Sequence, residues 1–375
     1  MIGLLLASID SVANVFTDVA RKKVLDRNYD AGLISLWCKI IASIIFGAII
    51  AILDLGWGVR PELPNIGGKI GVSPGLAFII YISLNALLEG TAILLNLRAL
   101  QVSPLSYCVP FMALTPLFLL PTGAIFLHES VSGGMVIGVF LVVLGALVVN
   151  RQMFARGLWE PARAIIRERG SRYMLMVALL LTVTNLLDKW FLLAGSNGEP
   201  TSFLVKFSRT IILSAGKCAM LSLFFAGLTI VRLGNWRPYR NGKTGLVQAA
   251  TSFSWNRVLR EMPVWLSVAA VLEALVLILQ LTALQFLVAA LVISIKRAGM
   301  ILAVALGWFI FKERGITDRI IASQVMTVGV LIFFLTKPDS SGKAILETRG
   351  ATILAIIAIA GMALALFQTR RRDSR

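Results

Sequence analysis

Residues 89–101, EGTAILLNLRALQ, are similar in sequence to residues 273–285, EALVLILQLTALQ, which lie 184 positions later. Without a gap, the same offset superposes further identical residues: Gly123 on Gly307, Glu129 on Glu313, and Gly145 on Gly329. A looser match at an offset of 167 superposes a Ser-xxx-Lys pattern: Ser35 and Lys39 on Ser202 and Lys206. Self-similarity at a fixed spacing is the signature of a structural repeat. The chain therefore contains two copies of one unit.

The composition places these copies in a membrane. The 375 residues are 58% hydrophobic and 15% charged, with a mean hydropathy of +0.85. A helix needs about 20 apolar residues to cross the roughly 30 Å of hydrocarbon in a bilayer. Eleven segments approach or exceed that length, namely 2–20, 32–53, 75–98, 103–127, 132–150, 173–195, 201–231, 263–285, 287–311, 319–336 and 351–368. We therefore predict an all-α membrane protein.

The repeat divides these helices into two sets of five and one extra. The expected parts are a first five-helix repeat (1–150), a cytoplasmic linker with an interfacial helix (151–172), a second repeat (173–336), and an extra helix with a basic tail (337–375). A second interfacial helix is expected at 244–261. Because five is odd, the second copy must enter the membrane inverted. Inverted repeats are typical of secondary transporters, whose site lies between the copies near the bilayer midplane.

The basic residues predict the orientation. Of the 36 Lys and Arg residues, 24 fall on one predicted side, 5 on the other and 7 within spans. Loops rich in Lys and Arg face the cytoplasm. The N-terminus is thus expected outside and the C-terminus in the cytoplasm, with the bacterial inner membrane as the expected location. The net charge of +17 then reflects topology, and we expect no nucleic-acid partner.

Two stretches resemble a known family. PFMALTPLFLLPTGAIFLHE (110–129) and SIKRAGMILAVALGWFIFKE (294–313) are similar to segments of the drug/metabolite transporter superfamily, in its EamA-like branch with two five-helix repeats. The resemblance implies that fold and a transport activity. The pair Lys296 and Arg297 also resembles the phosphate-binding pair of triose-phosphate translocators. The further lysine that those proteins carry in the fourth helix would fall near Met112 here, and it is absent from this sequence.

Charged residues within the spans are the candidate site. A charge at mid-membrane costs ~2.5–3.5 kcal/mol on insertion scales, so such residues face the interior of the bundle. Seven bases and five acids lie within spans, which leaves a surplus of two positive charges. The candidate substrate-binding residues are Lys296, Arg297, Arg209, Lys217 and Lys206. The candidate coupling or counter-ion residues are Glu89, Glu273 and Asp10.

Neutral polar residues on the same helix faces complete the candidate cavity: Asn85, Asn96 and Gln280, with Lys39. For each base the alternatives are contact with a substrate, pairing with a buried acid, and extension of the side chain to the membrane surface. Glu129 and Glu313 each follow a helix at a tight turn, where we expect them to cap the helix that comes next. Gly299, Ala303 and Gly307 continue the Lys296 face, and these small residues should let a neighbouring helix or a ligand approach closely.

We therefore expect a secondary transporter that moves a small anionic or zwitterionic metabolite, with phosphorylated metabolites included in that class, by alternating access, driven by proton coupling or exchange. One alternative is a flippase for a lipid-linked sugar or polyprenyl phosphate. Another, of a different class, is a membrane scaffold or sensor that transports nothing. The sequence holds no catalytic motif, so we expect no enzyme, no cofactor and no metal site. The expected partners are the substrate and membrane lipid, and a homodimer is possible.

Overall fold

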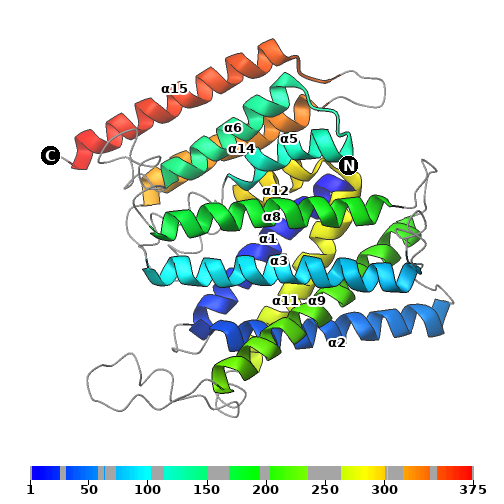
Figure 1. The fold of residues 1–375 in the computed structure, drawn as a ribbon. Helices are drawn as coiled ribbons and strands as arrows, with labels where there is room; N and C mark the ends of the chain where they lie inside the picture. Colours follow the sequence, from blue (N-terminus) through cyan, green and yellow to red (C-terminus); the bar gives the residue numbers. More distant parts are fainter. Residues whose placement is uncertain are drawn as a thin grey trace, which may run out of the picture. The chain divides into compact units, whose positions relative to one another are not determined.

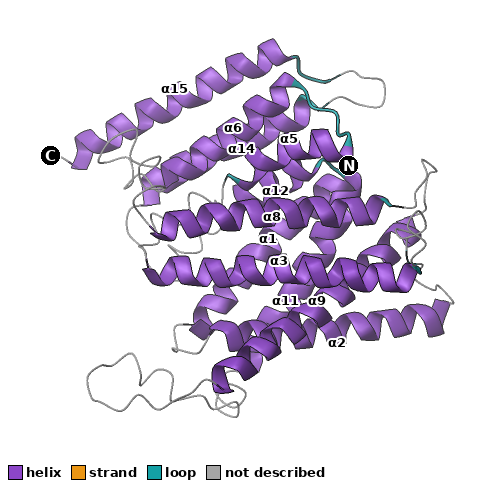
Figure 2. Cartoon of the chain, in the orientation of Figure 1, coloured by secondary structure: helices purple, strands orange, loops and turns teal. Residues whose placement is uncertain are grey.

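The computed structural model describes residues 2–25, 31–57, 73–102, 114–149, 169–194, 203–234, 263–299, 316–337 and 344–373, with the single positions 63 and 302. Within these ranges the regular secondary structure is helical and contains no strand (Figure 2). The predicted all-α class is confirmed for this part of the chain. The helices labelled in Figure 1 are α1 (Ile2–Leu25), α2 (Ala31–Trp57), α3 (Pro74–Val102), α5 (Thr115–Leu127), α6 (Gly133–Val149), α8 (Arg169–Leu193), α9 (Phe203–Gly234), α11 (Pro263–Phe286), α12 (Ala289–Ala298), α14 (Ile316–Leu335) and α15 (Thr348–Asp373).

These helices coincide with the eleven predicted segments. The helix expected at 103–127 is described from Thr115 onward, and the one expected at 287–311 is described from Ala289 to Ala298. Met112, Glu313 and the interfacial helix predicted at 244–261 lie outside the described residues. Of the linker predicted at 151–172, the structure describes residues 169–172, which open α8.

Five of the described helices are long and apolar enough to cross a membrane by themselves. They contain the segments Gly32–Gly56, Pro74–Asn96, Arg169–Leu193, Phe203–Ile230 and Val264–Phe286. Five shorter apolar segments lie in α1, α5, α6, α14 and α15. Many large apolar side chains on these helices are exposed, among them Leu55, Ile230 and Val264. Such a surface suits lipid. The chain is an integral membrane protein, and the arrangement of ten spans plus one stays a prediction.

The chain folds into two compact units. Unit 1 comprises residues 1–15, 91–193 and 279–375, and unit 2 comprises residues 16–90 and 194–278. Three long helices, α1, α3 and α11, each contribute one part to unit 1 and the other part to unit 2. Each unit is described by itself below.

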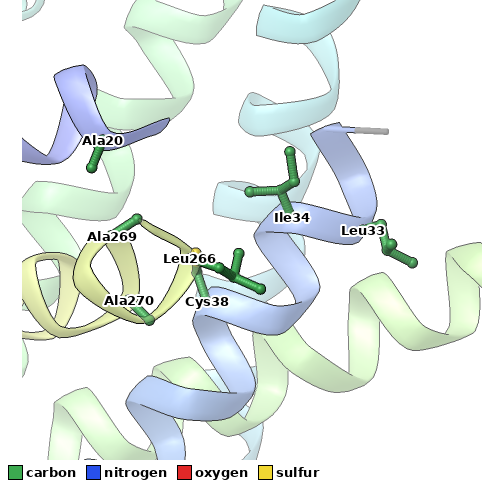
Figure 3. Close-up of a cluster of buried hydrophobic side chains, with 7 residues drawn as sticks. All are labelled: Ala20, Leu33, Ile34, Cys38, Leu266, Ala269 and Ala270. Atoms are coloured by element: carbon green, nitrogen blue, oxygen red, sulfur yellow. The ribbon is translucent and has the colours of Figure 1, made fainter. Parts of the chain in front are cut away.

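Unit 2 is built on the packing of α2 against α9. Phe46 of α2 is fully buried beside Ile211 and Cys218 of α9, in a cluster that also includes Ala274 of α11. A second apolar cluster joins the end of α1 to α2 and α11. Figure 3 shows its members, Ala20, Leu33, Ile34, Cys38, Leu266, Ala269 and Ala270.

Unit 1 is built on a close contact between α6 and α14. A Cβ atom at Gly138 would lie 2.6 Å from the carbonyl oxygen of Gly329, and one at Gly329 would lie 2.7 Å from that of Gly138. Only glycine permits this approach of two backbones, as at other helix contacts in membranes. The eleventh helix, α15, packs on α14 and α6 through Ala351, Ala355 and Met362.

The packing pairs helices that hold the same position in the two predicted copies. α2 and α9 are the second helix of each copy, α5 and α12 the fourth, and α6 and α14 the fifth, and each of these pairs is in contact. Each compact unit therefore contains helices from both copies. If each copy folded by itself, each compact unit would contain the helices of one copy only. The division of the chain into sequence copies at 1–150 and 173–336 stays a prediction.

Candidate functional site

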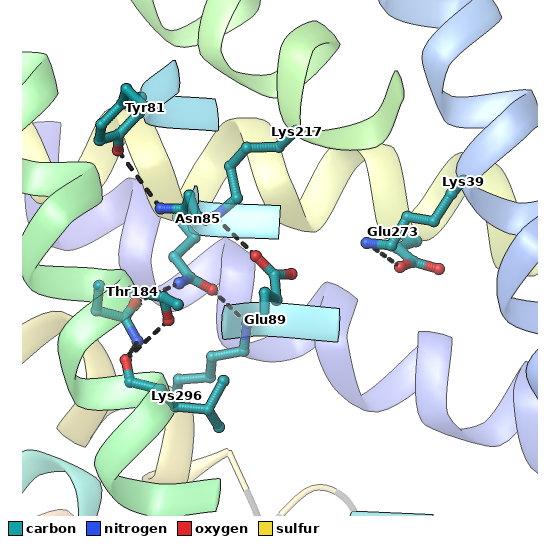
Figure 4. Close-up of polar contacts among 11 residues, drawn as sticks. Lys39, Tyr81, Asn85, Glu89, Thr184, Lys217, Glu273 and Lys296 are labelled. Atoms are coloured by element: carbon teal, nitrogen blue, oxygen red, sulfur yellow. Dashed lines mark hydrogen bonds and ion pairs between the residues drawn. The ribbon is translucent and has the colours of Figure 1, made fainter. Parts of the chain in front are cut away.

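Unit 2 holds four charged side chains in two tight pairs, both drawn in Figure 4. The Nζ atom of Lys39 (α2) lies 2.7 Å from Oε1 of Glu273 (α11). The Nζ atom of Lys217 (α9) lies 2.9 Å from Oε2 of Glu89 (α3). Glu89 also interacts electrostatically with Lys39, so the pairs form one cluster with no net charge. Of the three alternatives for a base within a span, Lys39 and Lys217 show pairing with an acid, and both acids are half-buried.

The other candidate residues of unit 2, one neutral and two basic, lie on the helices that carry Glu89 and Lys217. Asn85 is fully buried, one turn before Glu89, and its Nδ2 atom lies 3.5 Å from the Tyr81 hydroxyl (Figure 4). Arg209 is buried and donates from Nη1 to the carbonyl oxygen of Ala194, 3.2 Å away. Lys206 is half-buried. A role for Arg209, Lys206 and Lys217 in substrate binding stays a prediction.

Unit 1 holds the Lys296 side chain in a looser network. Its Nζ atom donates to Oε1 of Gln280 at 2.6 Å and lies 3.8 Å from Oδ1 of Asp10. Gln280 in turn donates from Nε2 to Oδ1 of Asn185 at 2.9 Å. The amide of Gln280, oriented by Asn185, therefore makes the close contact with Lys296. The carboxylate of Asp10 stands more than one hydrogen-bond length away.

Asp10 is the most enclosed acid of this network. Its side chain is 0% exposed, and neither carboxylate oxygen accepts a hydrogen bond within the part of the chain that the structure describes. A buried ionised carboxylate without donors is unfavourable, so its charge depends on the nearby ammonium group. The Lys296 side chain is 16% exposed, compared with 8% for Lys39 and 4% for Lys217 in their pairs. Lys296 thus stands farther from Asp10 than Lys39 and Lys217 stand from their glutamates, and its side chain is more exposed.

The close approach of α1 to α12 brings Asp10 and Lys296 together. The hydroxyl of Ser11 donates to the carbonyl oxygen of Ile295 at 3.1 Å. A Cβ atom at Gly299 would lie 2.0 Å from the same hydroxyl oxygen. The expectation that Gly299 admits a neighbouring helix is confirmed, and that helix is α1. Arg297 is half-buried in the last turn of α12, and Asn96 is half-buried on α3.

A further buried ion pair of unit 1 joins Lys189 of α8 to Glu129, which follows α5. Lys189 also donates to the carbonyl oxygen of Leu287, and Oε1 of Glu129 accepts the backbone N–H of Ala289 at 3.2 Å. The turn that places Glu129 has a left-handed residue, His128, with φ 52°. A Cβ atom at Gly123 would lie 2.4 Å from Oε2 of Glu129, so this glycine leaves room for the carboxylate.

The predicted cap is therefore wrong for Glu129. The helix that follows Glu129 is α6, and its N-terminus is capped by Ser132. The Ser132 hydroxyl accepts the N–H of Met135 at 3.3 Å. Glu129 instead accepts from the first residue of α12, which comes from the other copy of the repeat. Sequence proximity favoured the nearer helix end, whereas tertiary packing brought a distant one into reach.

Sequence reasoning missed three residues of these networks. Asn185 and Ser11 are small polar residues in apolar helices, and the only signal that could have found them is the cost of an unsatisfied polar group in a membrane. Lys189 is one of the seven bases within the predicted spans, and its position beside Asp188 favoured a local pair of these two neighbours, whereas the structure pairs Lys189 with Glu129. The described residues contain no group of three or more His, Cys, Asp or Glu side chains able to hold a metal ion.

The helices define the class of an integral membrane protein with charged side chains in its interior, and comparison with known proteins agrees with that class. Residues 1–151 match the EamA-like transporter family, which confirms the resemblance for that part of the chain. The match ends beside residue 150, the predicted end of the first copy. No curated protein shows significant sequence similarity to the chain. A solved structure titled "Crystal structure of protein" is similar in fold, with a TM-score of 0.60 and 15% identity over 90% of this chain and 99% of that chain.

Proposed function

We propose that the protein is a secondary transporter for a small anionic or zwitterionic metabolite, with Lys296 as the principal anion-binding group. One observation carries this proposal. Lys296 stands 3.8 Å from its buried counter-ion Asp10, whereas the lysines of unit 2 stand 2.7 and 2.9 Å from theirs. A carboxylate or phosphate can therefore take the place of Asp10 at Lys296 without breaking a tight ion pair.

Asp10 then couples the anion to a proton. When an anion pairs with Lys296, the Asp10 carboxylate loses its countercharge in an enclosed position without donors. Protonation of Asp10 removes that cost, so anion binding and proton binding favour each other. Glu89 and Glu273 were equal candidates for this role. Each is held by its own lysine at hydrogen-bonding distance, which favours a structural role for both.

The rest of the proposal concerns the membrane. The two inverted copies provide alternating access. The excess of Lys and Arg on one side favours an N-terminus outside and a C-terminus in the cytoplasm, in a bacterial inner membrane. The contacts between equivalent helices of the two copies support this arrangement. Arg297, adjacent to Lys296, supplies a second cation that can bind a carboxylate or phosphate through two donors.

A ligand screen tests the anion site. Purified protein in detergent is mixed with citrate, glycerol 3-phosphate, inorganic phosphate and undecaprenyl phosphate, and thermal unfolding is followed for the parent, Lys296→Ala and Arg297→Ala. We expect at least one of these anions to stabilise the parent, and the stabilisation to disappear in Lys296→Ala. Arg98→Ala, which removes an exposed arginine, should respond like the parent. Equal stabilisation of the parent and Lys296→Ala would refute the assignment.

A transport assay tests the coupling. Proteoliposomes are loaded with the stabilising anion and diluted into its radiolabelled form, with and without an imposed pH gradient. We expect the gradient to accelerate uptake in the parent and to have no effect in Asp10→Asn, which still exchanges one anion for another. Transbilayer movement of undecaprenyl phosphate alone would favour the flippase, and no exchange of any anion would favour the scaffold.

A further inference from the structure

The chain breaks between α11 and α12, at a corner formed by residues 287 and 288. The apolar side chains around this corner cannot form hydrogen bonds with the backbone groups that the break leaves without partners. Leu287 and Val288 separate the two helices, and both are buried. The first residues of α12, Ala289 to Val292, are 0% exposed. The first amide groups of a helix lack acceptors within that helix, and in a membrane no water is present to supply them. Val288 provides no side-chain cap.

The Glu129–Lys189 pair satisfies both sides of this corner. Lys189 donates to the carbonyl oxygen of Leu287, before the break, and Glu129 accepts the N–H of Ala289, after it. The two side chains also form an ion pair with each other, and each is 7% exposed. A salt bridge between α8 and the turn after α5 thereby holds the start of a helix to which neither residue belongs.

The position of this corner bears on the anion site. Ala289 and Lys296 are seven residues apart, which places them on one face of α12 at a separation of about 10 Å. At its other end, α12 is held by the hydrogen bond from Ser11 to Ile295, next to Asp10. The distance between Lys296 and Asp10 therefore depends on the contacts at both ends of one short helix.

We infer that Glu129 and Lys189 are positioning residues for the anion site: their ion pair anchors the N-terminus of α12 and so sets the placement of Lys296. The effect on anion binding rests on the proposed function. The anchoring of α12 itself can be measured without a substrate. Neither side chain needs to touch the anion.

Two double variants separate the ion pair from the helix cap. Glu129→Leu with Lys189→Met removes both charges, so that no buried charge is left alone, and it also removes the acceptor for Ala289. Glu129→Gln with Lys189→Met removes the charges but keeps a side-chain carbonyl that can accept that N–H. The matched control is Glu89→Leu with Lys217→Met, which removes one buried pair from unit 2 and leaves α12 unchanged.

Hydrogen–deuterium exchange of residues 287–298 is the first readout. Loss of a helix cap should make exchange of these amides about tenfold faster in Glu129→Leu/Lys189→Met. The increase should be smaller in Glu129→Gln/Lys189→Met and absent in the control variant. Unchanged exchange in the first variant, or equal increases in all three, would overturn the anchoring.

Anion exchange in proteoliposomes, with inorganic phosphate and citrate as probes, is the second readout. We expect Glu129→Leu/Lys189→Met to raise the half-saturating concentration at least severalfold. Arg98→Ala, at an exposed position outside both charge networks, is the control for this readout and should leave it unchanged. Faster amide exchange with an unchanged half-saturating concentration would overturn the positioning role. If neither probe is exchanged by the parent, the proposed function fails for these anions, and the amide exchange still decides the anchoring.

Discussion

The lysine–glutamate pairs of unit 2 and the Lys296 network of unit 1 compensate interior charge in different ways. In unit 2, Lys39 and Lys217 each contact a glutamate at hydrogen-bonding distance, and the four charges cancel. In unit 1, Lys296 makes its close contact with a neutral amide and leaves its acid, Asp10, 3.8 Å away. The first arrangement is suited to holding helices together. The second separates Lys296 from Asp10 by more than a hydrogen-bond length, and the Asp10 carboxylate accepts no hydrogen bond from the described residues.

The largest decrease in the free energy of unfolding is expected when one member of a tight ion pair in unit 2 is removed. Glu273→Leu leaves the Lys39 ammonium group buried without its acid, and loss of one partner of a buried pair costs about 3–5 kcal/mol. We expect a decrease of that order in the free energy of unfolding, measured by denaturant titration in mixed micelles. The double variant Lys39→Met/Glu273→Leu should recover most of the loss, because no lone charge remains. A double variant as unstable as Glu273→Leu would mean that the ion pair itself stabilises the fold, beyond the avoidance of a lone buried charge.

An intermediate effect is expected where α1 meets α12. In Gly299→Ala the new Cβ atom would lie 2.0 Å from the hydroxyl oxygen of Ser11, so α1 must shift and the Ser11–Ile295 hydrogen bond must weaken. Overpacking of this kind costs about 1–3 kcal/mol. We also expect weaker stabilisation by the anion found in the ligand screen, because the shift moves Asp10 relative to Lys296.

Gly47→Ala provides the matched control for this prediction. No atom lies within 4 Å of a Cβ built at Gly47, in the middle of α2. This replacement should leave stability unchanged or raise it by up to about 1 kcal/mol, since alanine favours helix more than glycine does. If both variants lose the same stability, the cost belongs to the loss of glycine and not to the α1–α12 contact.

The smallest effect is expected at Asp10. The carboxylate accepts no hydrogen bond within the described residues, so Asp10→Asn removes a buried charge while Lys296 keeps its bond to Gln280. We expect a change in the free energy of unfolding of less than about 1 kcal/mol, of either sign. A loss as large as that of Glu273→Leu would show that the Asp10–Lys296 pair is as structural as the pairs of unit 2.

Several parts of the fold and the site were predictable from the sequence. Long apolar segments determine where the helices lie, because no other element satisfies its backbone within a bilayer. The offset of 184 residues located the two copies, and the positions of Glu89, Glu273 and Lys296 within apolar helices marked them as interior groups. The choice between pairing and substrate contact was not predictable. It depends on differences of about 1 Å in the distance between a lysine and its acid, such as 2.7 Å for Lys39–Glu273 and 3.8 Å for Lys296–Asp10. Helix periodicity does not determine distances so finely.

The sequence alone thus determined that this is an all-α membrane protein with a repeated unit and charged residues in its interior. Those properties follow from local composition and from self-similarity along the chain. Only the tertiary structure decided which acid meets which base, that Glu129 caps α12 instead of α6, and that each compact unit mixes helices of both copies. These contacts join residues that are far apart in the sequence, such as Asp10 and Lys296. Their partners are chosen by how helices pack, which no stretch of sequence specifies by itself.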